Sequence, residues 1–333
     1  MIPRRKRGRQ SEEAQRQFEA DLGGFIDLML EINERVGFKM SSRGWCYALE
    51  EYGLGKGEFD TAQKVINDCR KNGLLPNGFI AEDTARSFNC IEREVDETSP
   101  EEEAQYIIDQ TYRAYLNYYP ISFWAGQPYY IQMLVEKIDL KSLFEPICRR
   151  YAIPIASARG WSAIRQRKEL VKRFKDCEAR GQTPVLLYAG DHDPVGLRIS
   201  DFLKSHLQEI YRATGWLPTN LIIDRFGLNY DFIMDNNLSW IPNLETGRKG
   251  KINDLSDPRH RDHHLPYVQD YLRQFGPKKV EANAIVVAPE MGRKLVEETI
   301  GKYIDPDDLA EHHRAITELQ QEVKEHVLRL MTD

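Results

Sequence analysis

The chain has 333 residues, 41% of them hydrophobic and 29% charged, with a formal net charge of −6. This composition is typical of a soluble globular protein long enough for about two domains. No apolar run reaches the roughly 18 residues of a membrane span, and the basic N-terminus lacks the apolar stretch of a signal peptide, so we expect no membrane partner. The five cysteines lie singly, which argues against a zinc ribbon and favours a cytoplasmic protein, nucleoid-associated if bacterial.

Charge is segregated along the chain although the net value is modest. Acidic residues gather between Glu92 and Glu103. Basic residues gather in three clusters, which are Arg4 to Arg9, Arg165 to Lys175 and Arg248 to Arg261. A negative net charge does not suggest a nucleic-acid-binding protein, but clustered basic residues can bind phosphates locally. Taken alone, each cluster is equally well explained as a solvated helix face or a tail.

Residues 1–37 are expected to form a basic arm and then a helix, because their apolar residues recur with helical spacing. Residues 38–90 contain two helical stretches, 42–52 and 58–72, joined by a glycine-rich turn and followed by LLPNGFI, which suits a short strand or a turn. This outline is typical of a helix-turn-helix or winged-helix DNA-binding domain. A plain helical subdomain would give the same pattern.

Residues 91–125 are expected to form an acidic linker and a helix. From residue 126 onward strands and helices alternate, which predicts βαβ units and a parallel sheet. The predicted strands are 129–136, 152–157, 184–189 and 220–226, and later helices are expected at 265–275, 290–303 and 307–331. We therefore predict an α/β protein in which residues 126–333 form a Rossmann-like domain with C-terminal helices.

The stretch LLYAGDHDPVGLRI (186–199) ends a buried strand in two aspartates. Because side chains alternate along an extended strand, Asp191 and Asp193 point the same way and could share one cation. An Asx turn at Asp193 is the alternative. Glu136 ends another predicted strand, and parallel strands end at the same edge of a sheet. Three converging carboxylates repel one another unless a cation neutralises them, so the arrangement favours a Mg²⁺ site.

A Glu at one strand end and Asp-x-Asp at another resemble the signature of TOPRIM domains, found in topoisomerases, primases and some nucleases. The resemblance extends to the A subunit of topoisomerase VI and its meiotic double-strand-break relatives, which join a winged helix carrying a catalytic tyrosine to a TOPRIM domain. In SSRGWCYAL, Arg43 and Tyr47 match that family's motif, with Cys46 in place of its penultimate tyrosine. The similarity covers roughly residues 38–305, including GDHDPVG and VEANAI, and extends to phage and bacterial members of the group.

The resemblance implies a DNA transesterase like the type IIB topoisomerases, in which Tyr47 attacks a phosphate and becomes linked to the 5′ end of the broken strand. Arg43 would contact that phosphate, and Glu136, Asp191 and Asp193 would hold Mg²⁺. In the family the tyrosine of one protomer faces the metal site of the other, so a homodimer on double-stranded DNA is expected. The chain has no Walker-type loop, so ATP-driven strand passage would need a separate ATPase subunit.

Further contacts with the DNA backbone are expected from basic residues near the acids and in the clusters. They are Lys137, Arg165, Arg167, Lys168, Arg248, Lys249 and Lys251. His192, between the two aspartates, is either another phosphate contact or a packed loop histidine.

Two other functions fit the same sequence. The first is a TOPRIM nuclease that uses Mg²⁺ and water, with Tyr47 only structural. The second is a non-catalytic DNA-binding protein of the same fold, although a binding module has no use for three converging acids. One departure from the family bears on the chemistry. Its Glu-Leu-Asp-Ala-Leu pattern reads Glu281-Ala-Asn-Ala-Ile285 here, so Asn283 stands where an Asp is expected and implies lost or altered chemistry.

Overall fold

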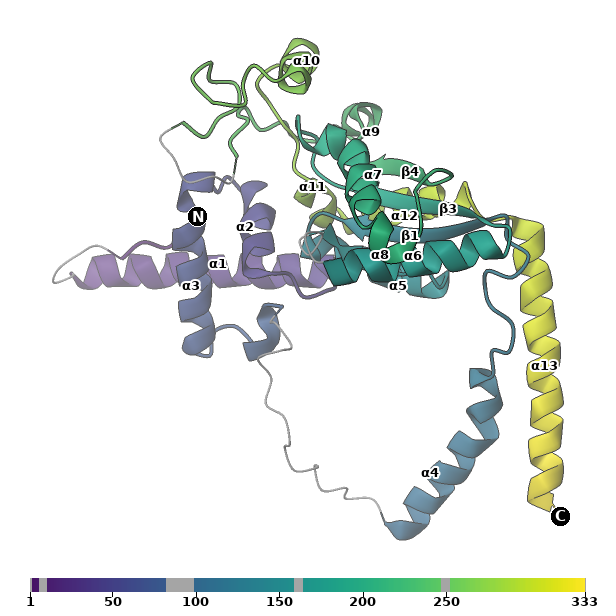
Figure 1. Ribbon diagram of the computed structural model, residues 1–333. Coiled ribbons are helices and arrows are strands. Elements are labelled where there is room, and N and C mark those ends of the chain that lie inside the picture. Colours follow the sequence, from purple (N-terminus) through teal and green to yellow (C-terminus); the bar gives the residue numbers. More distant parts are fainter. Residues whose placement is uncertain (1, 6–10, 82–98, 159–163, 247–251, 333) are drawn as a thin grey trace. The chain divides into compact units, whose positions relative to one another are not determined.

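The computed structural model describes residues 2–5, 11–81, 99–158, 164–246 and 252–332. The chain divides into two compact units. The first unit joins residues Met1–Glu82 to Ile131–Ile300, and the second joins Asp83–Tyr130 to Gly301–Asp333 (Figure 1). Every predicted catalytic and metal-binding residue belongs to the first unit.

The first unit opens with the long helix α1 (Glu12–Val36). The hydroxyl of Ser11 caps this helix by accepting a hydrogen bond from the N–H of Ala14, and two glutamates in the first turn complement the helix dipole. The helix ends at Gly37, whose φ of 72° is the left-handed conformation that glycine adopts readily. The predicted arm-and-helix segment is therefore helical from residue 12.

Two shorter helices follow, α2 (Ser42–Glu50) and α3 (Phe59–Lys71), and they pack against each other. Trp45 of α2 is fully buried and stacks on Phe79 with ring centroids 4.5 Å apart. The described residues from 38 to 81 contain helices and 3-10 turns but no strand. The two predicted helices are thus present, and of the two alternatives for LLPNGFI the structure has the turn, with the 3-10 helix η2 (Asn77–Phe79) in place of the strand of a wing.

Four strands form one sheet in the order β2-β1-β3-β4. Their bounds are Tyr129–Val135 (β1), Ile155–Ser157 (β2), Thr183–Ala189 (β3) and Ile222–Gly227 (β4). β1 is parallel to β2, and β3 is parallel to β4. β1 and β3 are buried almost throughout, which explains why both are continuous apolar runs in the sequence. The predicted α/β class with a parallel sheet is confirmed.

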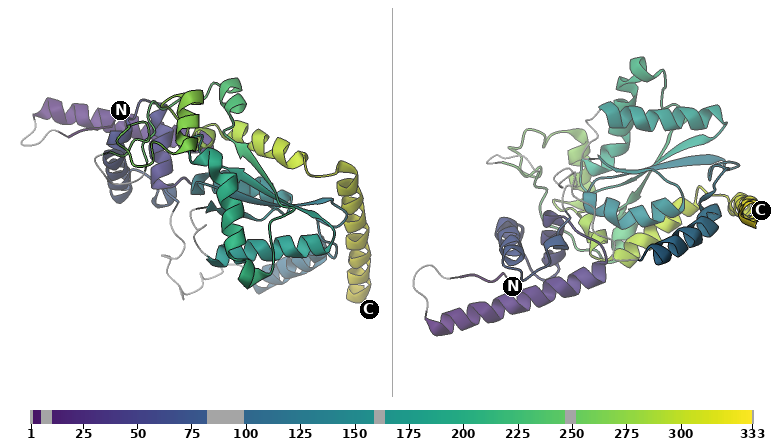
Figure 2. Two further views of the ribbon diagram at one scale, coloured as in Figure 1. Left: turned by 45° about the horizontal axis from the view of Figure 1, so that its top comes forward. Right: turned by 90° about the horizontal axis from the view of Figure 1, so that it is seen from below.

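Helices cover both faces of this sheet (Figure 2). One face carries α5 (Ile138–Arg150) and α12 (Pro289–Gly301), and the other carries α6 (Ile164–Ala179), α7 (Ile199–Glu209) and α8 (Tyr211–Thr214). The connection after β4 contains α9 (Tyr230–Asp235), α10 (Pro266–Phe275) and α11 (Asn283–Val286). This connection returns to the strand ends, because His192 forms an antiparallel bridge with Val280.

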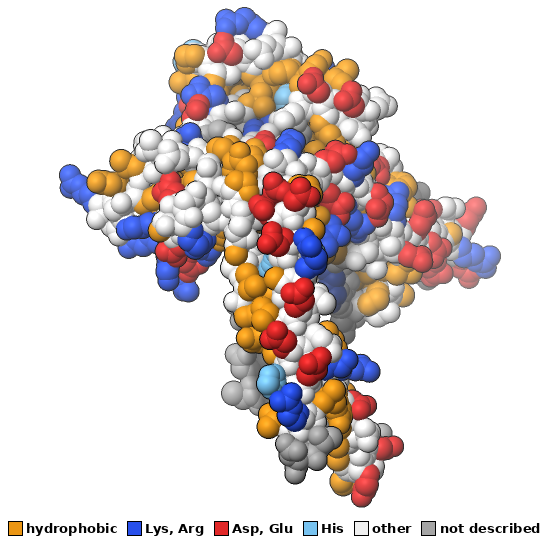
Figure 3. Space-filling view, turned by 90° about the vertical axis from the view of Figure 1, so that its right-hand side faces the viewer, with side chains coloured by type: hydrophobic (Ala, Val, Ile, Leu, Met, Phe, Trp, Pro, Cys, Tyr) orange, Lys and Arg blue, Asp and Glu red, His pale blue; other side chains and the backbone are white. Residues whose placement is uncertain are grey.

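The second unit contains α4 (Pro100–Arg113), the 3-10 turn η4 (Ala114–Asn117) and the long helix α13 (Pro306–Thr332). The side-chain amide of Gln320 on α13 donates to the backbone oxygens of Leu116 and Tyr118 at 3.0 and 3.1 Å, which holds η4 against α13. Acidic and apolar side chains lie side by side along α13 (Figure 3). Among the described residues, no helix has the length and apolar character needed to cross a membrane.

Candidate functional site

The acidic loop that follows β3, residues 190–196, has a glycine at each end because neither position has room for a side chain. At Gly190 a Cβ atom would lie 2.8 Å from Oε2 of Glu136, and at Gly196 it would lie 2.1 Å from the backbone oxygen of Asp191. The two glycines therefore let the loop fold tightly against the end of β1.

Asp193 forms an Asx turn and also belongs to the carboxylate cluster, the two alternatives that the sequence left open. Its Oδ1 accepts a hydrogen bond from the N–H of Gly196 at 2.6 Å, which is the geometry of an Asx turn. The same side chain lines a pocket together with Asp191 and Glu136. Burial, with a further effect from the charge of Asp191, raises the pKa of Asp193. The turn and the carboxylate cluster thus coexist.

Asp191 is only 6% exposed, and both of its carboxylate oxygens accept hydrogen bonds. Oδ1 accepts from the N–H of Ala282 at 2.7 Å, and Oδ2 accepts from Nζ of Lys137 at 2.8 Å. The N–H of Asp191 donates to Oε2 of Glu136 at 2.9 Å. Burial raises the pKa of Asp191 to about 6 against the lowering effect of Lys137, and the charge of Glu136 raises it further. Adjacent strand ends therefore do bring these acids together.

Lys137 supplies the positive charge that the cluster needs. Its Nζ lies 2.8 Å from Oδ2 of Asp191 and 3.6 Å from Oε1 of Glu136. Burial opposes the charge of Lys137, but the two carboxylates outweigh burial and raise its pKa. The sequence suggested that Lys137 contacts a phosphate, whereas in this arrangement it is the counter-ion of the acids.

The donor set fits Mg²⁺ chemically, because Glu136, Asp191 and Asp193 offer carboxylate oxygens, the ligands this ion prefers. Lys137 contacts two of the three acids with a single charge, so a divalent ion would bind them only after the ammonium group has moved aside. Within the described ranges, no group of three or more His, Cys, Asp or Glu side chains is arranged to hold a metal ion.

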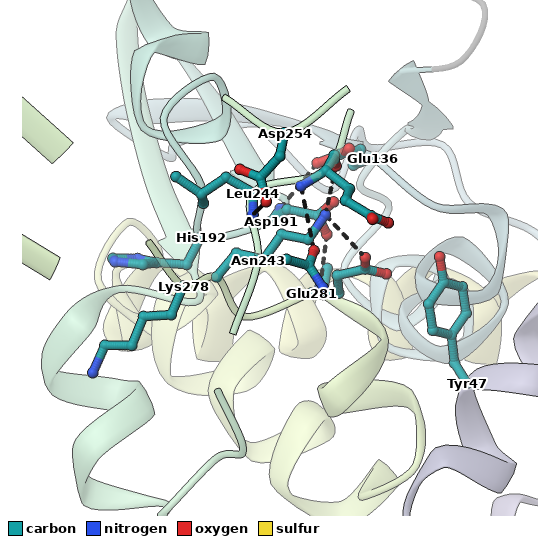
Figure 4. A network of polar contacts seen from close by, with 12 residues as sticks. Tyr47, Glu136, Asp191, His192, Asn243, Leu244, Asp254, Lys278 and Glu281 are labelled. Carbon is teal, nitrogen blue, oxygen red and sulfur yellow. Dashed lines mark hydrogen bonds and ion pairs between the residues drawn. The ribbon is translucent and has the colours of Figure 1, made fainter. Parts of the chain in front are cut away.

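Tyr47 lies on α2, 9% exposed, with its ring edge-on to Phe59 at 5.2 Å. Its hydroxyl points toward the side of the cluster where the carboxylates of Glu281 and Glu136 lie (Figure 4). The hydroxyl and Glu281 line the same pocket, and Nε of Arg43 donates to the hydroxyl oxygen at 3.3 Å. Burial and then the charge of Glu281 raise the pKa of Tyr47 to about 12, while Arg43 acts in the opposite direction.

The N-terminus of α2 is anchored beside the acids by Asp139, which follows Lys137 closely in the chain. The backbone N–H and the hydroxyl of Ser41 donate to Asp139 at 2.7 and 2.9 Å. Gly44 allows this approach, because a Cβ atom there would lie 2.6 Å from a carboxylate oxygen of Asp139. Cys46, on the same helix, is buried and contacts the backbone oxygens of Ser42 and Phe59 rather than the acids.

A pocket of about 490 Å³ has the tyrosine and the acids in its wall. Its lining residues are Ser41, Arg43, Tyr47, Glu136, Lys137, Ile138, Asp139, Asp191, Asp193, Pro194, Val195, Leu244, Glu245, Thr246, Leu255, Lys279, Glu281 and Asn283. All five predicted catalytic and metal-binding residues are in this list. One chain therefore brings its own tyrosine and its own three acids to the same pocket.

The predicted DNA contacts on α6 lie outside this pocket. Arg167 is 9% exposed, and its guanidinium contacts Glu209 at 2.9 Å and the backbone oxygen of His206 at 3.1 Å. This placement favours a structural role for Arg167 over a contact with DNA. Arg165 and Lys168 are exposed. The remaining predicted contacts, Arg248, Lys249 and Lys251, lie outside the described residues.

His192 is a packed histidine rather than a phosphate contact. It is 1% exposed, its Nδ1 lies 2.8 Å from the backbone oxygen of Leu228, and its ring contacts Trp240, Tyr271 and Phe275. Burial lowers its pKa to about 4, so the ring is neutral at pH 7. Its side chain points away from the carboxylates, as alternation along the chain requires.

Sequence reasoning missed two residues of the site, Glu281 and Lys279. They come from the connection after β4, and the ion pair between them is 3.5 Å long and buried. In the VEANAI segment, the residue that the sequence singled out was Asn283, which is 4% exposed and also lines the pocket. The one signal for Glu281 in the sequence was its place in that segment.

Compared with models of protein families, with curated proteins and with solved structures, the chain matches none.

Proposed function

We propose that the protein is a Mg²⁺-dependent DNA-cleaving transesterase that uses Tyr47 as its nucleophile. The observation that carries this proposal is that Tyr47, Arg43, Glu136, Asp191 and Asp193 line one pocket. A tyrosine whose hydroxyl faces a cluster of acids is the arrangement needed to attack a phosphate held by a cation. The resemblance of the same residues to the topoisomerase VI A subunit agrees with this proposal.

In the proposed reaction, the hydroxyl of Tyr47 attacks a phosphodiester and releases a 3′ oxygen. Arg43 already donates to the tyrosine oxygen at 3.3 Å, so its guanidinium can stabilise the phenolate and then contact the phosphate. Glu136, Asp191 and Asp193 would hold Mg²⁺, which when bound would stabilise charge on the phosphate and on the leaving oxygen.

The proposed substrate is double-stranded DNA, and a homodimer would place one site against each strand. Strand passage driven by ATP would require a separate subunit. Because the tyrosine faces acids of its own chain, we propose that each cleavage site is built from one chain, in contrast to the arrangement across two protomers that the family resemblance implies.

A second candidate is a Mg²⁺-dependent nuclease in which water attacks the phosphate. The burial of Tyr47 and the rise of its pKa to about 12 favour this candidate, because a hydroxyl that is hard to deprotonate is a poor nucleophile. The acids and the pocket would then serve the same metal, and Tyr47 would only form part of the wall.

The test is to incubate labelled linear and supercoiled DNA with wild-type protein and with Tyr47→Phe, with and without Mg²⁺, and to stop the reactions with detergent. The proposal predicts a covalent protein–DNA adduct that requires both Mg²⁺ and Tyr47. Cleavage without an adduct in both proteins would establish the nuclease instead. DNA binding without cleavage in either protein would indicate a non-catalytic DNA-binding protein.

A further inference from the structure

We propose that Glu281 is the general base of this site, the group that accepts the proton of Tyr47 when the tyrosine attacks DNA. The inference rests on the proposed transesterase function and adds to it a catalytic residue outside the tyrosine motif and the acid triad.

The position of Glu281 is fixed from both sides by the acidic loop. Just before it, Val280 exchanges backbone hydrogen bonds with His192 at 2.8 and 3.2 Å. Just after it, the N–H of Ala282 donates to Oδ1 of Asp191 at 2.7 Å. Glu281 is 8% exposed, so its carboxylate stands in the pocket wall with little freedom to turn toward solvent.

The charged groups around the phenol oxygen are placed as proton transfer requires. The hydroxyl of Tyr47 points toward the side of the pocket where the carboxylate of Glu281 lies (Figure 4), and Arg43 donates to the same oxygen at 3.3 Å. As the proton moves to Glu281, the positive guanidinium stays beside the oxygen that becomes negative. The arrangement therefore stabilises the nucleophilic form at the moment that it is produced.

The other acids of the pocket are committed to different partners. Asp191 accepts from Lys137 and Ala282, Glu136 accepts from the N–H of Asp191, and Asp193 accepts from the N–H of Gly196. Glu281 is paired with Lys279, and of these described carboxylates it is the one whose charge acts most strongly on the Tyr47 hydroxyl.

Several charged groups surround this carboxylate and will shape its pH dependence. Arg43 and Tyr47 face it from α2, Lys137 faces it from the end of β1, and Lys279 lies 3.5 Å from its Oε1. The charge of Asp191, across the pocket, also interacts with it. Lys279 is 7% exposed, so its ion pair with Glu281 is buried in the pocket wall.

The step balances without any further reactant than water. A bond forms between the tyrosine oxygen and phosphorus, and the bond from phosphorus to the 3′ oxygen breaks. The proton of Tyr47 passes to Glu281, the leaving 3′ oxygen takes a proton from water, and the hydroxide that this leaves is neutralised by the solvent buffer. In the reverse reaction, which reseals the DNA, Glu281 returns the proton to the departing tyrosine.

The test compares Glu281→Gln, Glu281→Asp and wild-type protein in single-turnover adduct formation with Mg²⁺ between about pH 6 and 9. Gln keeps the shape but cannot accept the proton, so we expect its rate at pH 7 to fall by about 100-fold or more and to rise with pH as hydroxide takes over. Asp should restore part of the rate. Glu298→Gln is the matched control, because Glu298 is an exposed acid of α12 that does not line the pocket, and it should keep the wild-type rate.

Equal melting temperatures for the variants would show that each is folded. A folded Glu281→Gln variant with the wild-type rate and pH profile would overturn the role of Glu281 while leaving the transesterase function in place. A wild-type protein that forms no Tyr47-dependent adduct would overturn both, so the two failures are distinguishable.

Discussion

Ser41 donates two hydrogen bonds to Asp139, one from its backbone N–H at 2.7 Å and one from its hydroxyl at 2.9 Å. Ser41 is the N-cap of the helix that carries Tyr47, and Asp139 lies just after the strand end that carries Glu136. This pair therefore sets the position of the tyrosine relative to the acids.

Asp139→Ala should loosen that connection. Asp139 is 4% exposed, and its loss leaves the backbone N–H of Ser41 without its charged acceptor. A hydrogen bond to a charged group contributes about 1.5–3 kcal/mol, so we expect unfolding to become easier by about 2 kcal/mol in urea titrations. Adduct formation should fall with it. The exposed Asp176→Ala is the control, and equal stabilities for the two variants would show that the contact does not hold α2 in place.

If the tyrosine and the acids of one site come from one chain, heterodimers of two inactive variants should stay inactive. Tyr47→Phe and Asp191→Ala, co-expressed with different tags and purified through both, should form no adduct, because each chain lacks part of its own site. A site shared between protomers would instead recover activity, since the tyrosine of one chain would meet the intact acids of the other. Recovered adduct would therefore exclude the one-chain site.

Lys137→Met should reveal the competition between lysine and metal. Without Mg²⁺ the variant should melt below the wild type, because Asp191 and Glu136 then repel each other without their ammonium counter-ion. Added Mg²⁺ should raise the melting temperature more in the variant than in the wild type, since no lysine has to be displaced. An identical response of the two proteins to Mg²⁺ would argue against a metal at these carboxylates.

His192 should make folding stability depend on pH. Its pKa is about 4 when folded against an ordinary value of 6.5, so the neutral ring stabilises the fold above pH 6.5 and that contribution is lost as the pH falls toward 4. The loss amounts to about 3 kcal/mol. Urea titrations of wild type and His192→Phe at several pH values should show a difference that changes across this window. A difference independent of pH would contradict a buried neutral histidine.

The strand ends were predictable because an apolar run that ends in an acid is a local pattern, and parallel strands end at one edge. Glu136 and Asp191 were found in this way. Glu281 was not, because its place depends on the bridge between His192 and Val280, a tertiary contact that no periodicity reveals.

Some charged residues have partners in the structure that the sequence did not suggest. Arg167 can be buried because its guanidinium pairs with the carboxylate of Glu209 on α7. The basic cluster of α6 gave no sign of this pairing. The ion pairs of Lys137 with the acids were also not predictable, because the sequence does not show where the side chain of a residue just after a strand will point. Helix ends were closer to expectation: the predicted helices 290–303 and 307–331 are observed as Pro289–Gly301 and Pro306–Thr332.

The most direct test of the central claim is to identify the amino acid that carries the DNA. The adduct formed with Mg²⁺ would be digested with nuclease and trypsin, and the tryptic peptide GWCYALEEYGLGK (44–56) would be sequenced by mass spectrometry. The peptide contains both Tyr47 and Tyr52, so its fragments provide an internal control. The account predicts a 5′-phosphonucleotide on Tyr47 alone. A nucleotide on another residue, or cleaved DNA with this peptide unmodified, would contradict it.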